Sequence, residues 1–170
     1  MLLYNNVFSV CPLTTHIPLQ DVNKTINKNK LINCIKNINF FFKKKLKKKI
    51  EMIVLGINPH ASLDMSFKSK DYTLIKKVAK LFKNKIKIRG PVSSDTAFTK
   101  LKNKVFIGMY HDQVLIPFKM KNNFDGINIT IGKKLIRLSP DHGTGKDLIK
   151  KPKKINNTSF VKCLEFCEKY

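Results

Sequence analysis

The four histidines are the residues of this sequence best suited to chemistry, because imidazole is the commonest protein ligand for divalent transition metals. His16, His60 and His111 each follow a short apolar run that predicts a β-strand, and His142 follows another apolar run. Ligands of open α/β sheets gather at the carboxyl ends of the strands, where loops converge. We therefore expect His16, His60 and His111 to bind one metal ion. The alternative for each histidine alone is an ordinary surface or hydrogen-bonded residue.

Three neutral histidines leave coordination positions open for a substrate, which is typical of a catalytic metal site rather than a structural one. A metal held in this way polarises a hydroxyl group and lowers its pKa. Arg89 and Arg137 are the only arginines, so Arg137 marks a position where the forked guanidinium is needed.

Apolar runs and periodic segments predict the elements that position these residues. Strands are expected over 7–13, 52–57, 86–88, 105–109, 126–131 and 135–138. Helices are expected after Ile17-Pro18, over 31–46, over 72–82, after Gly90-Pro91 with Ser93, Ser94 or Asp95 as the cap, and over 159–168. Strands that alternate with helices predict a parallel or mixed α/β sheet.

The chain of 170 residues is long enough for one domain with a buried core, and its formal net charge of +23 invites a nucleic-acid interpretation. Nearly all of that charge is lysine spread along the chain among Asn, Ile and Phe, which favours mutational bias of an AT-rich genome over nucleic-acid binding. The four cysteines form no metal-finger spacing, which favours a reducing cytoplasm. No apolar run reaches the ~20 residues of a membrane span, and Met1 to Val10 makes a poor signal peptide.

Five phrases together resemble one family. They are Thr14-Thr15-His16-Ile17-Pro18-Leu19, Gly56-Ile57-Asn58-Pro59-His60-Ala61, Gly90-Pro91 followed by Asp95-Thr96 and Phe98, Met109-Tyr110-His111-Asp112-Gln113, and Asp141-His142-Gly143-Thr144. Each phrase is only moderately specific, but all five occur in the order of the 4-hydroxythreonine-4-phosphate dehydrogenase family, which belongs to pyridoxal phosphate synthesis. The sequence therefore closely resembles that family over nearly its whole length.

The resemblance implies an NAD-dependent oxidation of 4-phosphooxy-L-threonine in the cytoplasm, followed by decarboxylation to 3-amino-2-oxopropyl phosphate. It implies that His16, His60 and His111 hold zinc, magnesium or cobalt in a site shared between the two subunits of a homodimer. It also implies that Lys119, Asn128 and Arg137 bind the phosphorylated substrate. His142, Gly143 and Thr144 are expected beside NAD, and the general base stays unassigned.

The resemblance also implies an architecture like the second domain of isocitrate and isopropylmalate dehydrogenases, a mostly parallel or mixed sheet with helices on both faces. A metal-binding and dimerisation domain is expected over 1–155, and a helix that belongs with the first domain over 156–170. Met1-Leu2-Leu3 matches the middle of the family's chain, so the sequence corresponds to the C-terminal half. A separately encoded first half, a start-site error and a decaying gene are the alternatives.

Two segments depart from the family's pattern. Segment 62–68 lacks its glycine- and glutamate-rich stretch, and segment 145–152 lacks its stretch of small residues. Glycine permits the close approach of backbone to a ligand. We therefore expect weakened NAD binding and impaired activity in the isolated chain. The competing hypothesis is a basic binding module without catalysis that has kept the fold. The genomic sequence upstream of Met1 separates the two best, because an enzyme needs the first half.

Overall fold

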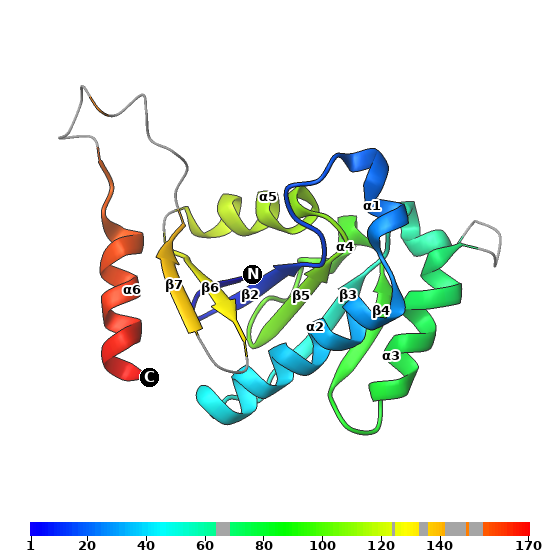
Figure 1. The fold of residues 1–170 in the computed structure, drawn as a ribbon, viewed down its shortest axis with the longest axis horizontal. Coiled ribbons are helices and arrows are strands. Elements are labelled where there is room, and N and C mark those ends of the chain that lie inside the picture. The colour runs from blue at the N-terminus through cyan, green and yellow to red at the C-terminus, as the bar shows by residue number, and fades with distance from the viewer. Residues whose placement is uncertain (64–68, 124, 133–135, 142–148, 150–154) are drawn as a thin grey trace.

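A computed structural model describes residues 1–170 except 64–68, 124, 133–135, 142–148 and 150–154 (Figure 1). The described residues form one seven-stranded sheet in the order β4-β3-β5-β2-β1-β6-β7. The strands are β1 (Leu2–Tyr4), β2 (Phe8–Pro12), β3 (Glu51–Leu55), β4 (Ile88–Val92), β5 (Lys104–Gly108), β6 (Ile127–Ile131) and β7 (Ile136–Pro140).

The sheet is parallel on one side and antiparallel on the other. β4, β3, β5 and β2 run parallel, with Pro12 opposite Gly108 and Val54 opposite Ile107. β1 is antiparallel to both β2 and β6, and β7 is antiparallel to β6. The mixed α/β sheet predicted from the order of elements is therefore confirmed.

Helices cover both faces of this sheet, as expected (Figure 1). They are α1 (Leu19–Thr25), α2 (Lys28–Phe40), a π-helical turn η1 (Phe41–Lys45), a 3-10 turn η2 (Pro59–Ser62), a π-helical turn η3 (Asp71–Lys76), α3 (Lys77–Phe82), α4 (Ser94–Ala97), α5 (His111–Asn122) and α6 (Thr158–Lys169). None of the helices in the described part of the chain is long and apolar enough to cross a bilayer.

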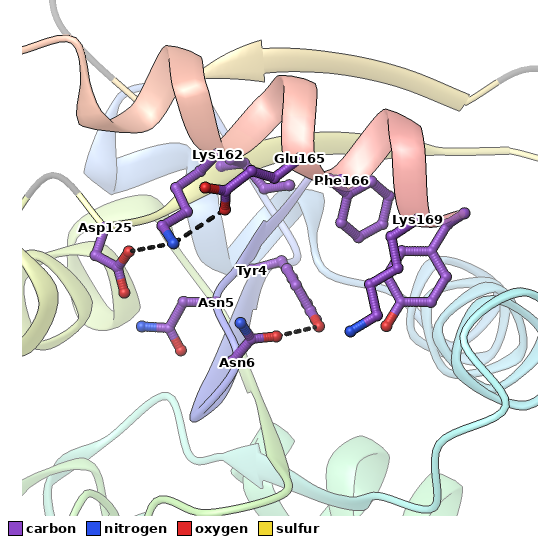
Figure 2. Close-up of a pocket in the computed structure, with 10 residues that line it drawn as sticks. Tyr4, Asn5, Asn6, Asp125, Lys162, Glu165, Phe166 and Lys169 are labelled. Atoms are coloured by element: carbon purple, nitrogen blue, oxygen red, sulfur yellow. Dashed lines mark hydrogen bonds and ion pairs between the residues drawn. The ribbon is translucent and has the colours of Figure 1, made fainter.

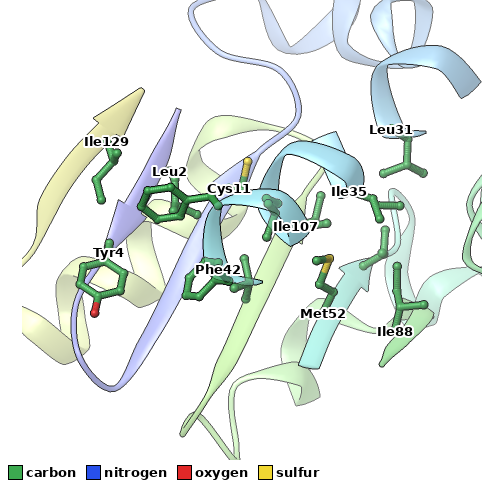
Figure 3. Packing of buried hydrophobic residues seen from close by; sticks show 14 of the residues in the cluster. Leu2, Tyr4, Cys11, Leu31, Ile35, Phe42, Met52, Ile88, Ile107 and Ile129 are labelled. Atoms are coloured by element: carbon green, nitrogen blue, oxygen red, sulfur yellow. The ribbon is translucent and has the colours of Figure 1, made fainter. Parts of the chain in front are cut away.

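Successive strand residues point to opposite faces of the sheet, so the core consists of two clusters. The larger cluster lies between the sheet and α2 (Figure 3). Leu31, Ile35 and Ile38 recur at helical spacing on α2 and are fully buried. Cys163 and Phe166 of α6 belong to the same cluster. The last helix therefore shares the core of the preceding sheet, while its expected relation to a first domain stays a prediction.

The smaller core cluster lies on the opposite face, under α5 and α4. The ring of Phe8 packs edge-to-face on Phe106 at 5.8 Å and on Phe118 at 5.3 Å between ring centroids. The ideal Cβ of Gly126 would lie 2.6 Å from Cε1 of Phe118, so only glycine lets the chain enter β6 so close to α5. Phe118 therefore fixes α5 on the sheet.

Two elements of the structure were not predicted from the sequence, and one strand lies later in the chain than expected. The helix α5 was not predicted, because Pro117 inside it argues against a helix and its apolar residues show little one-sided periodicity. The strand expected over 86–88 is β4 at Ile88–Val92, so Gly90-Pro91 lies inside this strand rather than after it. β4 is an edge strand, where one side has no ladder and proline is tolerated. The short strand β1 was also missed.

Replacing Phe118 with alanine should lower the free energy of unfolding by about 3–5 kcal/mol, because a fully buried ring would leave a cavity. Lys121→Ala on the same helix is the matched control, since Lys121 is exposed and its replacement should change stability by less than about 0.5 kcal/mol. Urea denaturation followed by circular dichroism measures both. Equal stabilities of the two variants would contradict the packing described for α5.

Candidate functional site

The three histidines follow three neighbouring parallel strands. His16 comes after β2, His60 after β3 and His111 after β5, and β5 lies between the other two strands in the sheet. Because parallel strands end at the same edge, their loops meet there. The structure therefore places all three predicted ligands along the carboxyl-terminal edge of these strands, the histidine edge. They lie in two hollows rather than one.

The first hollow holds two of the histidines. It measures about 340 Å³ and is lined by Thr14, His16, Ile17, Leu19, Val22, Tyr110, His111 and Asp112. The ring centroids of His16 and His111 are 5.7 Å apart, with the ring planes tilted by 52°. Two imidazoles at this separation can offer one nitrogen each to a single metal ion, whose Zn–N bonds are about 2.0–2.1 Å.

A carboxylate orients the ring of His111. Nδ1 of His111 lies 2.6 Å from Oδ1 of Asp112, and both side chains are partly exposed. A neutral imidazole that donates from Nδ1 keeps the lone pair of Nε2 available for a metal. Histidine ligands commonly carry such a carboxylate on the other ring nitrogen, so this pair suits a ligand role.

The second hollow lies next to the first and contains His60. It measures about 280 Å³ and is lined by Ile57, Asn58, Pro59, His60, Ser93, Ser94, Asp95, Tyr110 and Gln113. Tyr110 lines both hollows, so they adjoin one another. The hydroxyl of Ser93 donates to Asp95 at 2.5 Å and lowers the pKa of that carboxyl, and His60 acts in the same direction. Asp95 therefore brings a carboxylate to the side of His60.

The backbone around His60 is strained. His60, Ala61 and Ser62 have φ values of 49°, 52° and 60°, so three consecutive residues with side chains are left-handed. This conformation costs roughly 1–2 kcal/mol for each such residue. His16 is also left-handed, with φ of 54°. Strained backbone of this kind persists only where the surroundings determine it, and it concentrates at functional sites.

Gln113 ties together the loops at the edge. Its Nε2 donates to the carbonyl oxygen of Gly56 at 2.7 Å and lies 2.7 Å from Oγ of Ser94, and its Oε1 accepts from the backbone N–H of Met109 at 2.6 Å. These partners follow β3, β4 and β5. One amide side chain therefore fixes the relative positions of three loops, including those that carry His60 and His111.

A divalent metal fits this edge only in part. His16 and His111 can occupy two coordination positions of one ion, and His60 faces the adjacent hollow with Asp95. Within the described residues of a single chain, no group of three or more His, Cys, Asp or Glu side chains is arranged to hold a metal. Catalytic zinc sites use three protein ligands.

The three expected substrate ligands lie away from the histidines, toward β6 and β7. Asn128 of β6 is opposite Leu3, which belongs to the core cluster under α5, so its side chain lies on the α5 face. Arg137 of β7 pairs with Thr130, two residues after Asn128, so it lies on the same face and is exposed. Lys119 comes from α5 itself. The structure therefore brings these three to one face of the sheet.

Lys119 forms an ion pair with an acidic residue at the end of β7. Lys119 Nζ lies 3.2 Å from Oδ1 of Asp141, a nearly buried carboxylate. Oδ2 of Asp141 and Oδ1 of Asn128 are buried acceptors without a hydrogen-bond partner among the described residues. Buried acceptors are normally satisfied, so these two oxygens are exceptions within the described residues. In the sequence analysis Asp141 belongs to the motif Asp141-His142-Gly143-Thr144 and has no role of its own.

The residues expected beside NAD, His142, Gly143 and Thr144, lie outside the described residues. A further hollow, of about 140 Å³, lies between β1 and α6 (Figure 2). There Lys162 contacts Glu165 at 3.0 Å and Asp125 at 3.9 Å. None of the expected metal or substrate ligands lines this hollow, so it is separate from the histidine edge.

Sequence analysis gave no role to two residues that shape the site, Gln113 and Asp71. Gln113 belongs to the phrase Met109-Tyr110-His111-Asp112-Gln113, so a polar residue beside a candidate ligand was the available signal. Asp71 lies well after His60 in the chain and begins η3, yet its carboxylate contacts the His60 loop. The contact between Asp71 and the His60 loop forms only in the folded chain, so the sequence carried no signal for it.

Comparison with known proteins assigns the chain to a family. The family described as pyridoxal phosphate biosynthetic protein PdxA matches residues 1–167. The 4-hydroxythreonine-4-phosphate dehydrogenase of Sulfurihydrogenibium sp. (strain YO3AOP1) is 42% identical over 151 residues, which are 87% of this chain and 47% of that protein. That of Aquifex aeolicus (strain VF5) is 39% identical over 161 residues, which are 94% of this chain and 50% of that protein.

A crystal structure of 4-hydroxythreonine-4-phosphate dehydrogenase from Klebsiella pneumoniae superimposes with a TM-score of 0.80 at 28% identity, covering 96% of this chain and 51% of that one. The chain thus spans about half the length of the curated relatives it matches. These findings confirm the resemblance predicted from the five phrases. The chain belongs to the PdxA family of pyridoxal phosphate biosynthetic proteins.

Proposed function

We propose that this chain supplies the metal-binding and dimer-forming half of an NAD-dependent 4-hydroxythreonine-4-phosphate dehydrogenase. The observation that carries the proposal is the position of His16, His60 and His111 after three adjacent parallel strands. The relatives' name supports the reaction, an oxidation of 4-phosphooxy-L-threonine. Pyridoxal phosphate synthesis is the corresponding process, and the cytoplasm its proposed compartment.

Metal binding and substrate binding are assigned to two separate groups of residues. His16 and His111, with His60, would hold the divalent metal, and Lys119 with Arg137 supplies positive charge for the phosphate. Asn128 offers a buried acceptor to a donor group of the substrate. A metal held by these histidines would supply Lewis-acid chemistry to the substrate alcohol and to the charge that develops on decarboxylation.

We propose a homodimer in which the metal site is shared, so that a second copy of the chain completes the ligand set. A two-fold axis would then produce two identical sites. Large apolar side chains also stay exposed on α5 and α6, among them Ile116, Met120, Phe160 and Leu164, as expected for faces that associate. The phosphorylated substrate and a separately encoded first half are the other proposed partners.

Purified protein should bind one divalent ion per chain, with zinc, magnesium or cobalt as candidates, and His60→Ala should reduce that content. Leu19→Ala is the matched control, because Leu19 lines the hollow of His16 and His111 but has no donor atom. Mass spectrometry of the metal after exhaustive dialysis gives both values. Equal metal content in wild type and His60→Ala would remove His60 from the ligand set.

The chain should form a dimer of about twice 19.6 kDa in the presence of metal. Multi-angle light scattering at micromolar concentration measures the mass directly. His111→Ala tests whether metal and dimer are linked, because loss of a shared ligand should shift the mass toward the monomer. A stable monomer of the wild-type chain with metal present would argue against the shared site.

The 170-residue chain alone should show little or no dehydrogenase activity, at least about a hundredfold below a complete enzyme. Catalysis requires cofactor and substrate to be held in register, and misplacement by about 1 Å already costs on the order of a hundredfold. The assay follows NADH formation from 4-phosphooxy-L-threonine with added divalent metal. Co-expression with the first half of a relative is the complementation arm and should raise turnover, whereas full activity of this chain alone would refute the proposal.

A further inference from the structure

One buried carboxylate holds the loop that carries His60. Asp71, the first residue of η3, has no solvent-exposed surface. Its Oδ1 accepts from the backbone N–H of Ile57 at 2.7 Å. Its Oδ2 accepts from Nδ2 of Asn58 at 2.8 Å and the hydroxyl of Ser62 at 2.5 Å, with the N–H of Asn58 at 3.3 Å. Asp71 therefore contacts residues on both sides of His60.

These contacts make a closed unit, because Nδ2 of Asn58 also donates to the hydroxyl of Ser62 at 3.0 Å. Asn58, which lies before the left-handed turn, and Ser62, the last residue of that turn, are thus hydrogen-bonded to each other and to one carboxylate. The ideal Cβ of Gly56 would lie 2.8 Å from Cα of Ala61 and 3.2 Å from Oδ1 of Asp71. The loop therefore packs too closely to be rearranged without moving Asp71.

The chemistry of these contacts requires a carboxylate. An ionised aspartate only accepts hydrogen bonds, with about four lone-pair positions on its two oxygens, and every partner named here is a neutral donor. An asparagine at position 71 would have nearly the same shape but would turn an NH₂ group toward one set of these donors. Asp71→Asn therefore removes hydrogen-bond acceptors from the loop while leaving the volume of the side chain almost unchanged.

We propose that Asp71 is a positioning residue, which fixes the left-handed turn at residues 60–62 and so aims the imidazole of His60 for metal binding. The role of His60 as a metal ligand in this inference rests on the proposed function. Asp71 itself does not touch the ligand site, because its carboxylate is buried behind the loop. It acts on His60 through the backbone. Partners that orient a metal ligand typically contribute tenfold to a hundredfold to metal affinity.

The test compares Asp71→Asn with wild type by titration with cobalt(II), whose visible absorption reports both affinity and coordination geometry. Asp71→Asn should bind cobalt about 10–100-fold more weakly, and its absorption should approach that of His60→Ala. Ser62→Ala, which removes one donor of the same unit, should give a smaller loss of the same kind. This milder variant keeps the test informative if Asp71→Asn does not fold.

Ile75→Val is the matched control, because Ile75 is fully buried on the same π-helical turn but is not among the Asp71 contacts. It should lower the thermal midpoint while leaving cobalt affinity unchanged. Amide hydrogen exchange at Ile57 and Asn58 gives a second measurement, without metal. Exchange there should accelerate in Asp71→Asn and stay at the wild-type rate in Ile75→Val.

The outcomes separate this inference from the proposed function. If wild type binds no cobalt, the metal part of the proposed function fails. Amide hydrogen exchange, together with the NMR chemical shifts of the His60 ring in wild type and Asp71→Asn, then decides whether Asp71 fixes the loop. Unchanged exchange at Ile57 and Asn58 in Asp71→Asn would overturn the positioning role. Weaker cobalt binding by Ile75→Val to the same extent would also overturn it, since general destabilisation would then explain the loss.

Discussion

The arrangement of the site depends on the register of three parallel strands. β3, β5 and β2 are neighbours, and pairing of Val54 with Ile107 and of Pro12 with Gly108 makes them end at the same level. The backbone N–H of Leu13 then donates to the carbonyl of Gly108 at 2.7 Å, which continues the ladder into the loop before His16. A slip of one residue would turn the strand side chains to the opposite face and move every loop.

Buried and partly buried polar side chains hold the loops at this edge together. Thr14 donates to the carbonyl of Met109 at 2.7 Å, so the loops after β2 and β5 are joined. Gln113 joins the loop after β5 to those after β3 and β4, and Asp71 closes the loop of His60 from within. These hydrogen bonds offset the energetic cost of the three left-handed residues.

The sequence predicted the mixed sheet and the histidine edge, because both depend on local patterns. An apolar run ends and a histidine follows, and this can be recognised without knowing how the strands are ordered. The hollows could not be predicted, because which histidines share one depends on the loops that Gln113 and Asp71 fix. α5 was missed because Pro117 opposes the local preference, and packing of Phe118 and Val114 on the sheet outweighs it.

The histidines and the substrate candidates are separated within one chain by rigid structure. α5 begins at His111 on the histidine edge, and Lys119 lies eight residues further along it, about 12 Å at 1.5 Å per residue. β6, which carries Asn128, is two strands from β2, about 10 Å across the sheet. Neither distance can shrink without unpacking α5 or breaking the sheet. A single small substrate that uses both groups would therefore bridge this distance within one chain or draw them from two copies. The shared metal site of the proposed dimer provides the second arrangement with no change in the fold of either copy.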